Sequence, residues 1–191
     1  MEHWQELLDL TNPQKWTPHA FFELVRIFTS KTESERTLRF FANYLLPRVL
    51  KDIREYRKLN YHLFRSLQKG LYRPASWFRG VLMTFFSTPE ITIKQAQILA
   101  AVLMKTSIPN AHAAAVFYKC CELEYSGPQN VIMKTMIDKK FGLPAIVINR
   151  LVDWFCSFGK QSEEPMPVLW YWTLISFVKI YGGGINRSFD D

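Results

Sequence analysis

The side chains with the clearest chemical potential in this sequence are basic ones crowded into residues 31–80. That window holds 12 of the 24 Lys and Arg residues but only 4 of the 17 Asp and Glu residues, a net charge of +8, while the remainder holds 12 against 13. Clustered cations attract phosphates or an acidic protein surface, and a solvated helix face is the plainer interpretation. The candidate RNA-binding residues are Lys51, Arg54, Arg57, Lys58, His62, Arg65, Lys69, Arg73 and Arg79.

Aromatic side chains lie among the last of these cations, at Tyr72, Trp77 and Phe78. Such a mixture suits RNA, because guanidinium groups meet phosphates and rings stack on unpaired bases. Core packing is the alternative for Trp77 and Phe78, which stand four residues before Val81 and Leu82 on a helix. A secondary basic cluster, Lys134, Lys139 and Lys140, also fits favourable charge at a helix C-terminus.

Linear motifs for catalysis or metal binding are missing from the sequence. The four histidines lie outside any H-E-x-x-H, the three cysteines form no C-x-x-C pair, and no G-x-S-x-G occurs. The carboxylate pairs Glu122 with Glu124 and Glu163 with Glu164 have spacings that do not share a helical face. We therefore expect no enzyme, no cofactor, no metal and no small-molecule substrate; a spatially assembled site would need residues such as His112 or Asp138.

The elements that must position the basic residues are helices. From Pro47 to Lys69 the pattern predicts one helix about 35 Å long, with the cations within roughly 80° of arc opposite an apolar stripe. The stripe comprises Leu46, Val49, Ile53, Tyr56, Asn60, Leu63 and Leu67. Asn60 is the exception, because a polar side chain on that stripe would need a buried hydrogen-bond partner.

The rest of the chain predicts further helices separated by Pro, Gly and Asn breaks, with no period-2 alternation for strands. Thr17-Pro18 and the Thr92–Gln95 capping box mark two helix starts, and helices are expected over about 129–140, 144–158 and 167–181. The fold class is all-α: an array of antiparallel helix pairs, HEAT-like, with about nine helices and no sheet. Residues 1–181 would form a single helical domain, followed by a flexible Gly-rich tail over 182–191.

The N-terminus lacks the basic and apolar regions of an ordinary secretory signal, and the longest uncharged run, Pro165–Val178, has 14 residues and two prolines. That run is too short to cross a bilayer, so no membrane partner is expected. The odd number of cysteines favours reduced thiols in a cytosolic or nuclear protein.

Several separate blocks, in order and spacing, resemble the bystin family of small-subunit ribosome assembly factors: WTPHAFFELVRIF, LLPRVLKDIREYRKLNYHLFRSLQKGLYRPASWFRG, SIPNAHAAA, ELEYSG, MIDKKFGLP and MPVLWYW. The resemblance runs from about Trp4 to Tyr181. It implies a helical, HEAT-like scaffold without known catalysis that joins nucleolar pre-ribosomes and stays on the pre-40S particle into the cytoplasm. The implied partners are pre-18S rRNA, small-subunit ribosomal proteins of the head and beak, and other pre-40S assembly factors.

The sequence departs from the family pattern in several places. The long polar N-terminal extension and the further C-terminal helices of the family are missing, so a core fragment or truncated form is expected. The loop FFSTPEIT lacks the Cys-containing form, and Tyr171 stands where many relatives place histidine. Two hypotheses follow: an rRNA-binding assembly factor of the nucleolus and nucleus that shuttles to the cytoplasm, or a helical protein-protein interaction module that grips an acidic partner segment, with RNA contact incidental.

Overall fold

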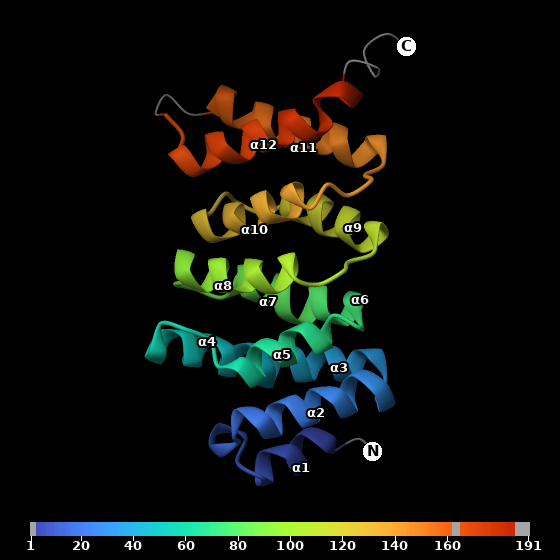
Figure 1. Cartoon of the computed structure of the whole chain (residues 1–191), viewed down its shortest axis with the longest axis vertical. Coiled ribbons are helices and arrows are strands. Elements are labelled where there is room, and N and C mark those ends of the chain that lie inside the picture. Colours follow the sequence, from blue (N-terminus) through green and yellow to red (C-terminus); the bar gives the residue numbers. More distant parts are fainter. Residues whose placement is uncertain (1–2, 162–164, 186–191) are drawn as a thin grey trace. The chain divides into compact units, whose positions relative to one another are not determined.

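The computed structural model describes residues 3–161 and 165–185, and within them it contains helices and no strand, which confirms the all-α prediction. The chain divides into two compact units, one ending at Pro89 and the other beginning at Glu90 (Figure 1). The HEAT-like arrangement and the single domain over 1–181 stay predictions. Among the described residues, none of the helices combines the length and the apolar character that a membrane crossing requires.

The first unit is built from helices of very different lengths, several of which join without a break. Its elements are α1 (Trp4–Leu10), η1 (Pro13–Lys15), α2 (Pro18–Lys31), α3 (Ser34–Phe40), η2 (Phe41–Leu45), α4 (Leu46–Tyr56), α5 (Tyr61–Gly70), α6 (Pro74–Trp77), η3 (Phe78–Met83) and α7 (Thr84–Ser87). Thr17 caps α2 by accepting a hydrogen bond from the Ala20 N–H, as the Thr-Pro start predicts.

Pro47 lies inside a helical run that continues from Ser34 to Tyr56. Proline cannot donate a backbone hydrogen bond, and its ring crowds the preceding turn. The turn just before it is π-helical, from Phe41 to Leu45, while Leu45 and Leu46 keep helical angles. The wider π turn gives the ring space, so the chain passes Pro47 without starting a separate helix.

The core of the first unit is dominated by aromatic rings. Phe28 of α2 and Phe40 of α3 stack with centroids 4.1 Å apart. Trp77 and Phe78 are 0% and 5% exposed, which confirms the core-packing interpretation for both. Gly80 permits a close approach, because a Cβ there would lie 2.6 Å from the carbonyl oxygen of Leu38.

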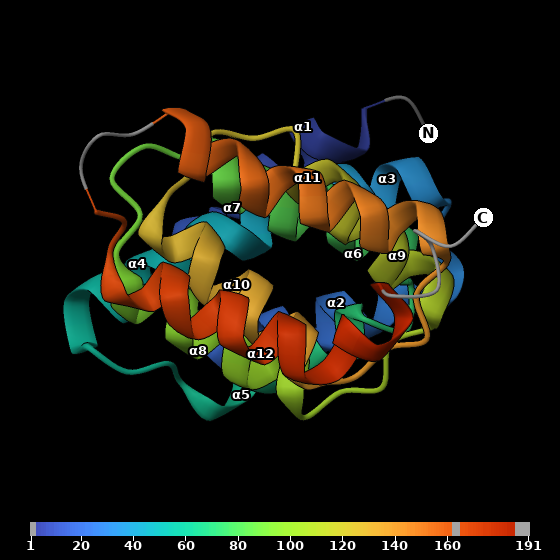
Figure 2. The same cartoon turned by 90° about the horizontal axis from the view of Figure 1, so that it is seen from above.

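The second unit consists of α8 (Ile93–Met104), α9 (Asn110–Cys120), α10 (Gly127–Asp138), α11 (Ala145–Gln161) and α12 (Val168–Ile185). Helix α10 packs between α8 and α12, and α9 packs against α11, so the helices form two layers (Figure 2). The predicted Thr92–Gln95 capping box is present. A second box, Ser126–Gln129, starts α10 at Gly127, two residues earlier than the sequence predicts.

Helix α12 continues through Gly182 and Gly183 to Ile185, whereas the sequence predicts a flexible tail from Gly182. The remainder of that tail, residues 186–191, lies outside the described residues, as do Glu163 and Glu164.

Candidate nucleic-acid-binding surface

The predicted single helix from Pro47 to Lys69 is wrong, because the chain breaks between α4 and α5. Helix α4 ends at Tyr56, and Arg57 adopts a left-handed conformation with φ 58° while its N–H donates to the Ile53 carbonyl at 2.9 Å. Asn60 then caps α5: its Oδ1 accepts from the His62 N–H at 2.9 Å. This cap satisfies one of the free N–H groups at the start of a helix.

Asn60 is therefore an exposed N-cap residue and not a buried polar residue on an apolar stripe. Its own N–H donates to the Oδ2 of Asp52 at 2.8 Å, so a buried carboxylate of α4 holds the start of α5. Tyr56, expected on the same stripe, is 62% exposed. The stripe is in fact two separate faces, one on α4 and one on α5, and α5 packs against α2.

Four of the candidate cations lie on α4 and in the loop after it, at Lys51, Arg54, Arg57 and Lys58, and all four side chains are exposed. The Nζ of Lys51 is 3.9 Å from the Glu55 carboxylate. The other three make no ion pair with any residue that the structure describes. We call Arg54, Arg57 and Lys58 the basic corner.

On α5 two candidate cations, Arg65 and Lys69, make contacts with aromatic rings. Nη1 of Arg65 donates to the Tyr61 hydroxyl at 3.0 Å, and the guanidinium lies 5.9 Å from the Phe22 ring centre. Nζ of Lys69 sits 4.0 Å from the centre of the Tyr72 ring. These cation–π contacts fix the directions of the side chains and leave their charge unpaired by carboxylates.

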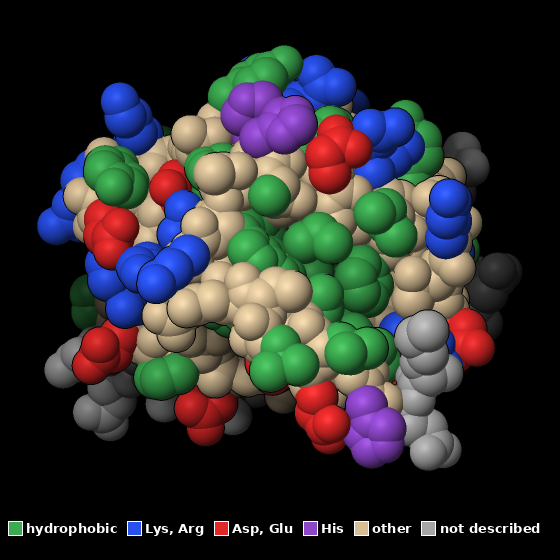
Figure 3. All heavy atoms as spheres, turned by 90° about the horizontal axis from the view of Figure 1, so that it is seen from below, with side chains coloured by type: hydrophobic (Ala, Val, Ile, Leu, Met, Phe, Trp, Pro, Cys, Tyr) green, Lys and Arg blue, Asp and Glu red, His purple; other side chains and the backbone are tan. Residues whose placement is uncertain are grey.

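His62 is half-buried on α5, and histidines meet on the face of the first unit seen in Figure 3. Its ring meets that of His19 from α2 edge to face, with centroids 5.1 Å apart. Lys and Arg side chains, with Asp and Glu side chains among them, lie along the margin of that face around a central group of apolar side chains (Figure 3). His62 thus belongs to the contact between α2 and α5 as well as to the basic surface.

Arg73 has a structural task that the sequence does not indicate. Its Nε donates to the Thr29 carbonyl at 2.8 Å, and its Nη1 lies 3.4 Å from the Ser34 hydroxyl. The Thr29 carbonyl is one of the last in α2, where helix carbonyls lack partners within the helix. Arg73 therefore caps α2, whereas Arg79, on η3, is exposed and without an ion pair among the described residues.

The secondary basic cluster is largely engaged within the second unit. Lys134 pairs with Asp138 at 2.7 Å. Nζ of Lys139 donates to the Thr106 carbonyl at 2.9 Å, beyond the end of α8, and burial lowers the pKa of this amine. Lys140 is exposed with φ 57°. The helix C-terminus interpretation fits Lys139, although it serves α8 and not its own helix α10.

Arg48 belongs with the candidate residues and was missed. It lies one turn before Lys51 on α4, so the i, i+3 spacing inside the basic window was the available signal. Its Nε is buried and has no hydrogen-bond partner among the described residues. Arg48 lines two cavities in the first unit, one with Lys51 and one with Lys58.

His, Cys, Asp and Glu side chains are the groups on which a metal site or a catalytic site would draw. In the described part of the chain, no three His, Cys, Asp or Glu side chains lie close enough to hold a metal ion. Glu122 pairs with Lys119 at 2.8 Å. Burial raises the pKa of Cys121 to about 12, with the charge of Arg150 opposing it, so this thiol stays protonated at neutral pH.

A family model described as Bystin matches residues 1–189. The chain is 39% identical over 188 residues to a protein named bystin from Nematostella vectensis, covering 98% of this chain and 44% of that protein. Bystin from Dictyostelium discoideum is 40% identical over 187 residues (97% and 39%), and bystin from Homo sapiens is 36% identical over 181 residues (95% and 41%). The chain thus spans less than half the length of these curated relatives.

Proposed function

The chain belongs to the bystin family, and from that premise we propose that it is a non-catalytic ribosome biogenesis factor that binds pre-18S rRNA and proteins on the head of the pre-40S particle. In this role it supports maturation and export of the small subunit. Its protein partners would be small-subunit ribosomal proteins of the head and beak and other pre-40S assembly factors. It would act in the nucleolus and nucleus and travel to the cytoplasm with pre-40S particles.

The observation that carries the rRNA part of this proposal is the basic corner. Arg54, Arg57 and Lys58 are exposed, close in sequence, and unpaired with any described carboxylate. Cations of this kind bind phosphate without first breaking an ion pair, and they release condensed counterions from the RNA. Arg65 of α5, held against the rings of Tyr61 on α5 and Phe22 on α2, adds a fourth charge whose direction is fixed before binding.

The break at Arg57 changes the shape of this proposed contact. A straight helix would place its cations along one line of phosphates, whereas α4 and α5 present theirs on either side of a turn. A bent or looped RNA segment fits such a corner better than the side of a regular duplex, because its backbone changes direction. Structured loops are also where RNA exposes unstacked bases that a protein can contact.

Salt-dependent RNA binding tests the proposal. We expect the triple variant Arg54→Glu, Lys58→Glu, Arg65→Glu to bind small-subunit rRNA fragments weakly. Each lost phosphate contact should reduce the slope of log affinity against log salt by about 0.7–0.9, so the slope should become shallower by roughly two units or more.

A matched control changes the same charge elsewhere. Lys94, Arg150 and Lys179 are exposed residues of the second unit, and their reversal to Glu alters the net charge equally. The control should keep the wild-type slope to within about one contact. Equal slopes for the wild type and the first triple variant would contradict the proposed rRNA surface.

The alternative, a module that binds an acidic protein segment, draws on the same unpaired cations. Pull-down of partners before and after nuclease treatment separates the two. Associations that all survive nuclease, together with no binding to naked rRNA, would favour the protein-binding alternative.

A further inference from the structure

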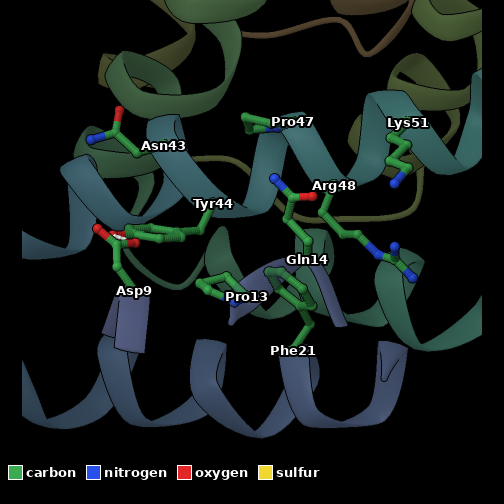
Figure 4. A pocket seen from close by; sticks show the side chains of 9 residues that line it. All are labelled: Asp9, Pro13, Gln14, Phe21, Asn43, Tyr44, Pro47, Arg48 and Lys51. Atoms are coloured by element: carbon green, nitrogen blue, oxygen red, sulfur yellow. Dashed lines mark hydrogen bonds between the residues drawn. The ribbon is translucent and has the colours of Figure 1, made fainter. Parts of the chain in front are cut away.

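The first unit contains a cavity of about 520 Å³, whose lining includes none of the residues of the basic corner (Figure 4). Helices α1, η1 and α2 form one wall, and the continuous helix through η2 and α4 forms the other (Figure 4). The lining residues are Asp9, Pro13, Gln14, Phe21, Asn43, Tyr44, Pro47, Arg48 and Lys51. This volume falls in the range of sites that hold small organic ligands.

The lining is electrically polarised. Asp9 lies at one end of the cavity, and Arg48 and Lys51 lie at the other (Figure 4). The lining carries two cations and one carboxylate, and Lys51 also lies 3.9 Å from Glu55, which is outside the lining. A ligand with an anionic group at one end and hydrogen-bond donors at the other therefore matches the cavity better than a simple anion does.

The cationic end has an unsatisfied donor. The half-buried side chain of Arg48 lines the cavity, and its Nε is buried and makes no hydrogen bond within the described residues. Arg48 also borders a second cavity of about 330 Å³ that includes Lys58 of the basic corner. The cavity and the basic corner thus meet at this arginine.

The cavity also offers polar groups of the kind that recognise a base. The side-chain amides of Gln14 and Asn43 are exposed and make no hydrogen bond to another described residue. Gln14 lies between the two ends of the cavity, and Asn43 lies beside Tyr44 (Figure 4). At the far end, the Tyr44 hydroxyl donates to Oδ1 of Asp9 at 2.9 Å. Burial and this bond raise the pKa of Tyr44 to about 12, so the hydroxyl keeps its proton and holds the carboxylate in place.

We propose that this cavity holds one unpaired nucleotide of RNA. The phosphate lies at Arg48 and Lys51, and the base edge meets the amides of Gln14 and Asn43, with an amino group directed to Asp9. Unpaired bases are the part of RNA that proteins read by hydrogen bonds to the base edge. The inference rests on the proposed function, and it names the feature of the RNA that the chain selects.

An acidic peptide fits the cavity less well. A single Asp or Glu side chain fills only a small part of about 520 Å³, and a second acidic group would meet the carboxylate of Asp9. A nucleotide instead supplies both the anion and the donors that the two ends of the cavity call for. We therefore commit to RNA and leave the peptide as an outcome of the test.

The test compares two variants of the 191-residue chain on two RNAs of equal length. One RNA is a single strand of about ten nucleotides and the other is a duplex, both measured by fluorescence anisotropy. The cavity variant is Gln14→Ala with Asn43→Ala, two exposed residues whose loss should leave the melting temperature unchanged. The corner variant is Arg54→Glu with Lys58→Glu.

We expect the cavity variant to bind the single strand about tenfold more weakly, the loss expected for two net hydrogen bonds, and to bind the duplex as the wild type does. The corner variant should weaken binding to both RNAs, because phosphate contacts do not depend on unpaired bases. Free AMP, added at a concentration equal to that of the nucleotides in the single strand, should compete poorly with the single strand for the protein. It lacks the contacts that the longer RNA makes with the basic corner.

Four results would overturn the inference. If the cavity variant keeps full affinity for the single strand while the corner variant loses affinity for both RNAs, the cavity is no nucleotide site and the proposed function stands. If the wild type binds neither RNA, the proposed function fails with it. AMP that competes as well as the single strand would indicate a free-nucleotide site, and a Glu-rich peptide whose binding alone falls in the cavity variant would indicate a protein ligand.

Discussion

Replacing Asn60 by alanine should lower the free energy of unfolding, and the sign of this effect separates a broken helix from a continuous one. In the structure the Asn60 side chain caps α5 by accepting the His62 N–H at 2.9 Å. Removing an asparagine N-cap costs about 1 kcal/mol, within a range of roughly 0.5–2 kcal/mol. In a continuous helix the same change would replace a polar residue on an apolar face by a better helix former and would stabilise the chain by about 0.5 kcal/mol.

Urea unfolding of the 191-residue chain, followed by circular dichroism, measures this difference at constant m-value. For a protein of this size, about 1 kcal/mol corresponds to a fall of about 2–4 °C in melting temperature. Asn60→Ser is the matched control, because serine caps helices about as well as asparagine. Its free energy of unfolding should stay within about 0.3 kcal/mol of the wild-type value. Wild-type or greater stability in the alanine variant, or equal damage from serine, would refute the capped break.

A second change probes the same corner from the other helix. Asp52 is 5% exposed, and its Oδ2 accepts the Asn60 N–H at 2.8 Å. Asp52→Asn keeps an acceptor oxygen but removes the charge, so we expect a loss of about 1 kcal/mol. Because the donor is the backbone N–H, alanine at position 60 keeps this bond, so the loss caused by Asp52→Asn in urea unfolding should persist in the Asn60→Ala background.

Three further predictions concern packing, capping and pH. Gly80→Ala should destabilise the chain by about 1–3 kcal/mol in thermal melts, because its Cβ would lie 2.6 Å from a carbonyl oxygen of α3. Gly183→Ala is the control: a Cβ there meets nothing within 4 Å, so this variant should be neutral or stabilising. Arg73→Met removes the 2.8 Å bond to a carbonyl near the end of α2 and should cost about 1–2 kcal/mol in urea unfolding, while Arg79→Met, at an exposed site, should change stability by less than about 0.5 kcal/mol; equal effects would contradict the capping role. Burial raises the pKa of Cys121 from 9.0 to about 12, so the unfolded thiol releases its proton at a lower pH than the folded one. The free energy of unfolding should therefore fall as the pH rises through that interval. Cys121→Ala should make this fall shallower, and an unchanged pH profile of the free energy of unfolding would contradict the burial of the thiol.

Much of the fold follows from local sequence, because caps and apolar spacing act within one or two turns. Thr17 before Pro18, and the Thr92–Gln95 box, fix helix starts through hydrogen bonds between neighbours. Burial of Trp77 likewise follows from its helical spacing to other apolar residues. These features depend on residues a few positions apart, which a sequence displays directly.

The candidate site was only partly predictable, because side chains of equal charge differ in what they contact. Arg54 and Arg73 both belong to the basic window, yet Arg54 is exposed while Arg73 caps α2 from 44 residues away. The spacing of Arg48 hinted at a shared face with Lys51 but not at a buried, unpaired Nε beside a cavity. A charge count records how many cations a segment has and not which of them are engaged.

The sequence by itself determined that this chain is helical, where most helices begin, and that its positive charge is concentrated between residues 31 and 80. Only the tertiary structure decided that the basic stretch is a corner. The apolar positions of α4 and α5 happen to stay in phase on one helical wheel, so periodicity could not reveal the break. The break exists because the Asp52 carboxylate holds the Asn60 N–H and because α5 turns away to pack against α2, and both are contacts between elements that no local pattern records.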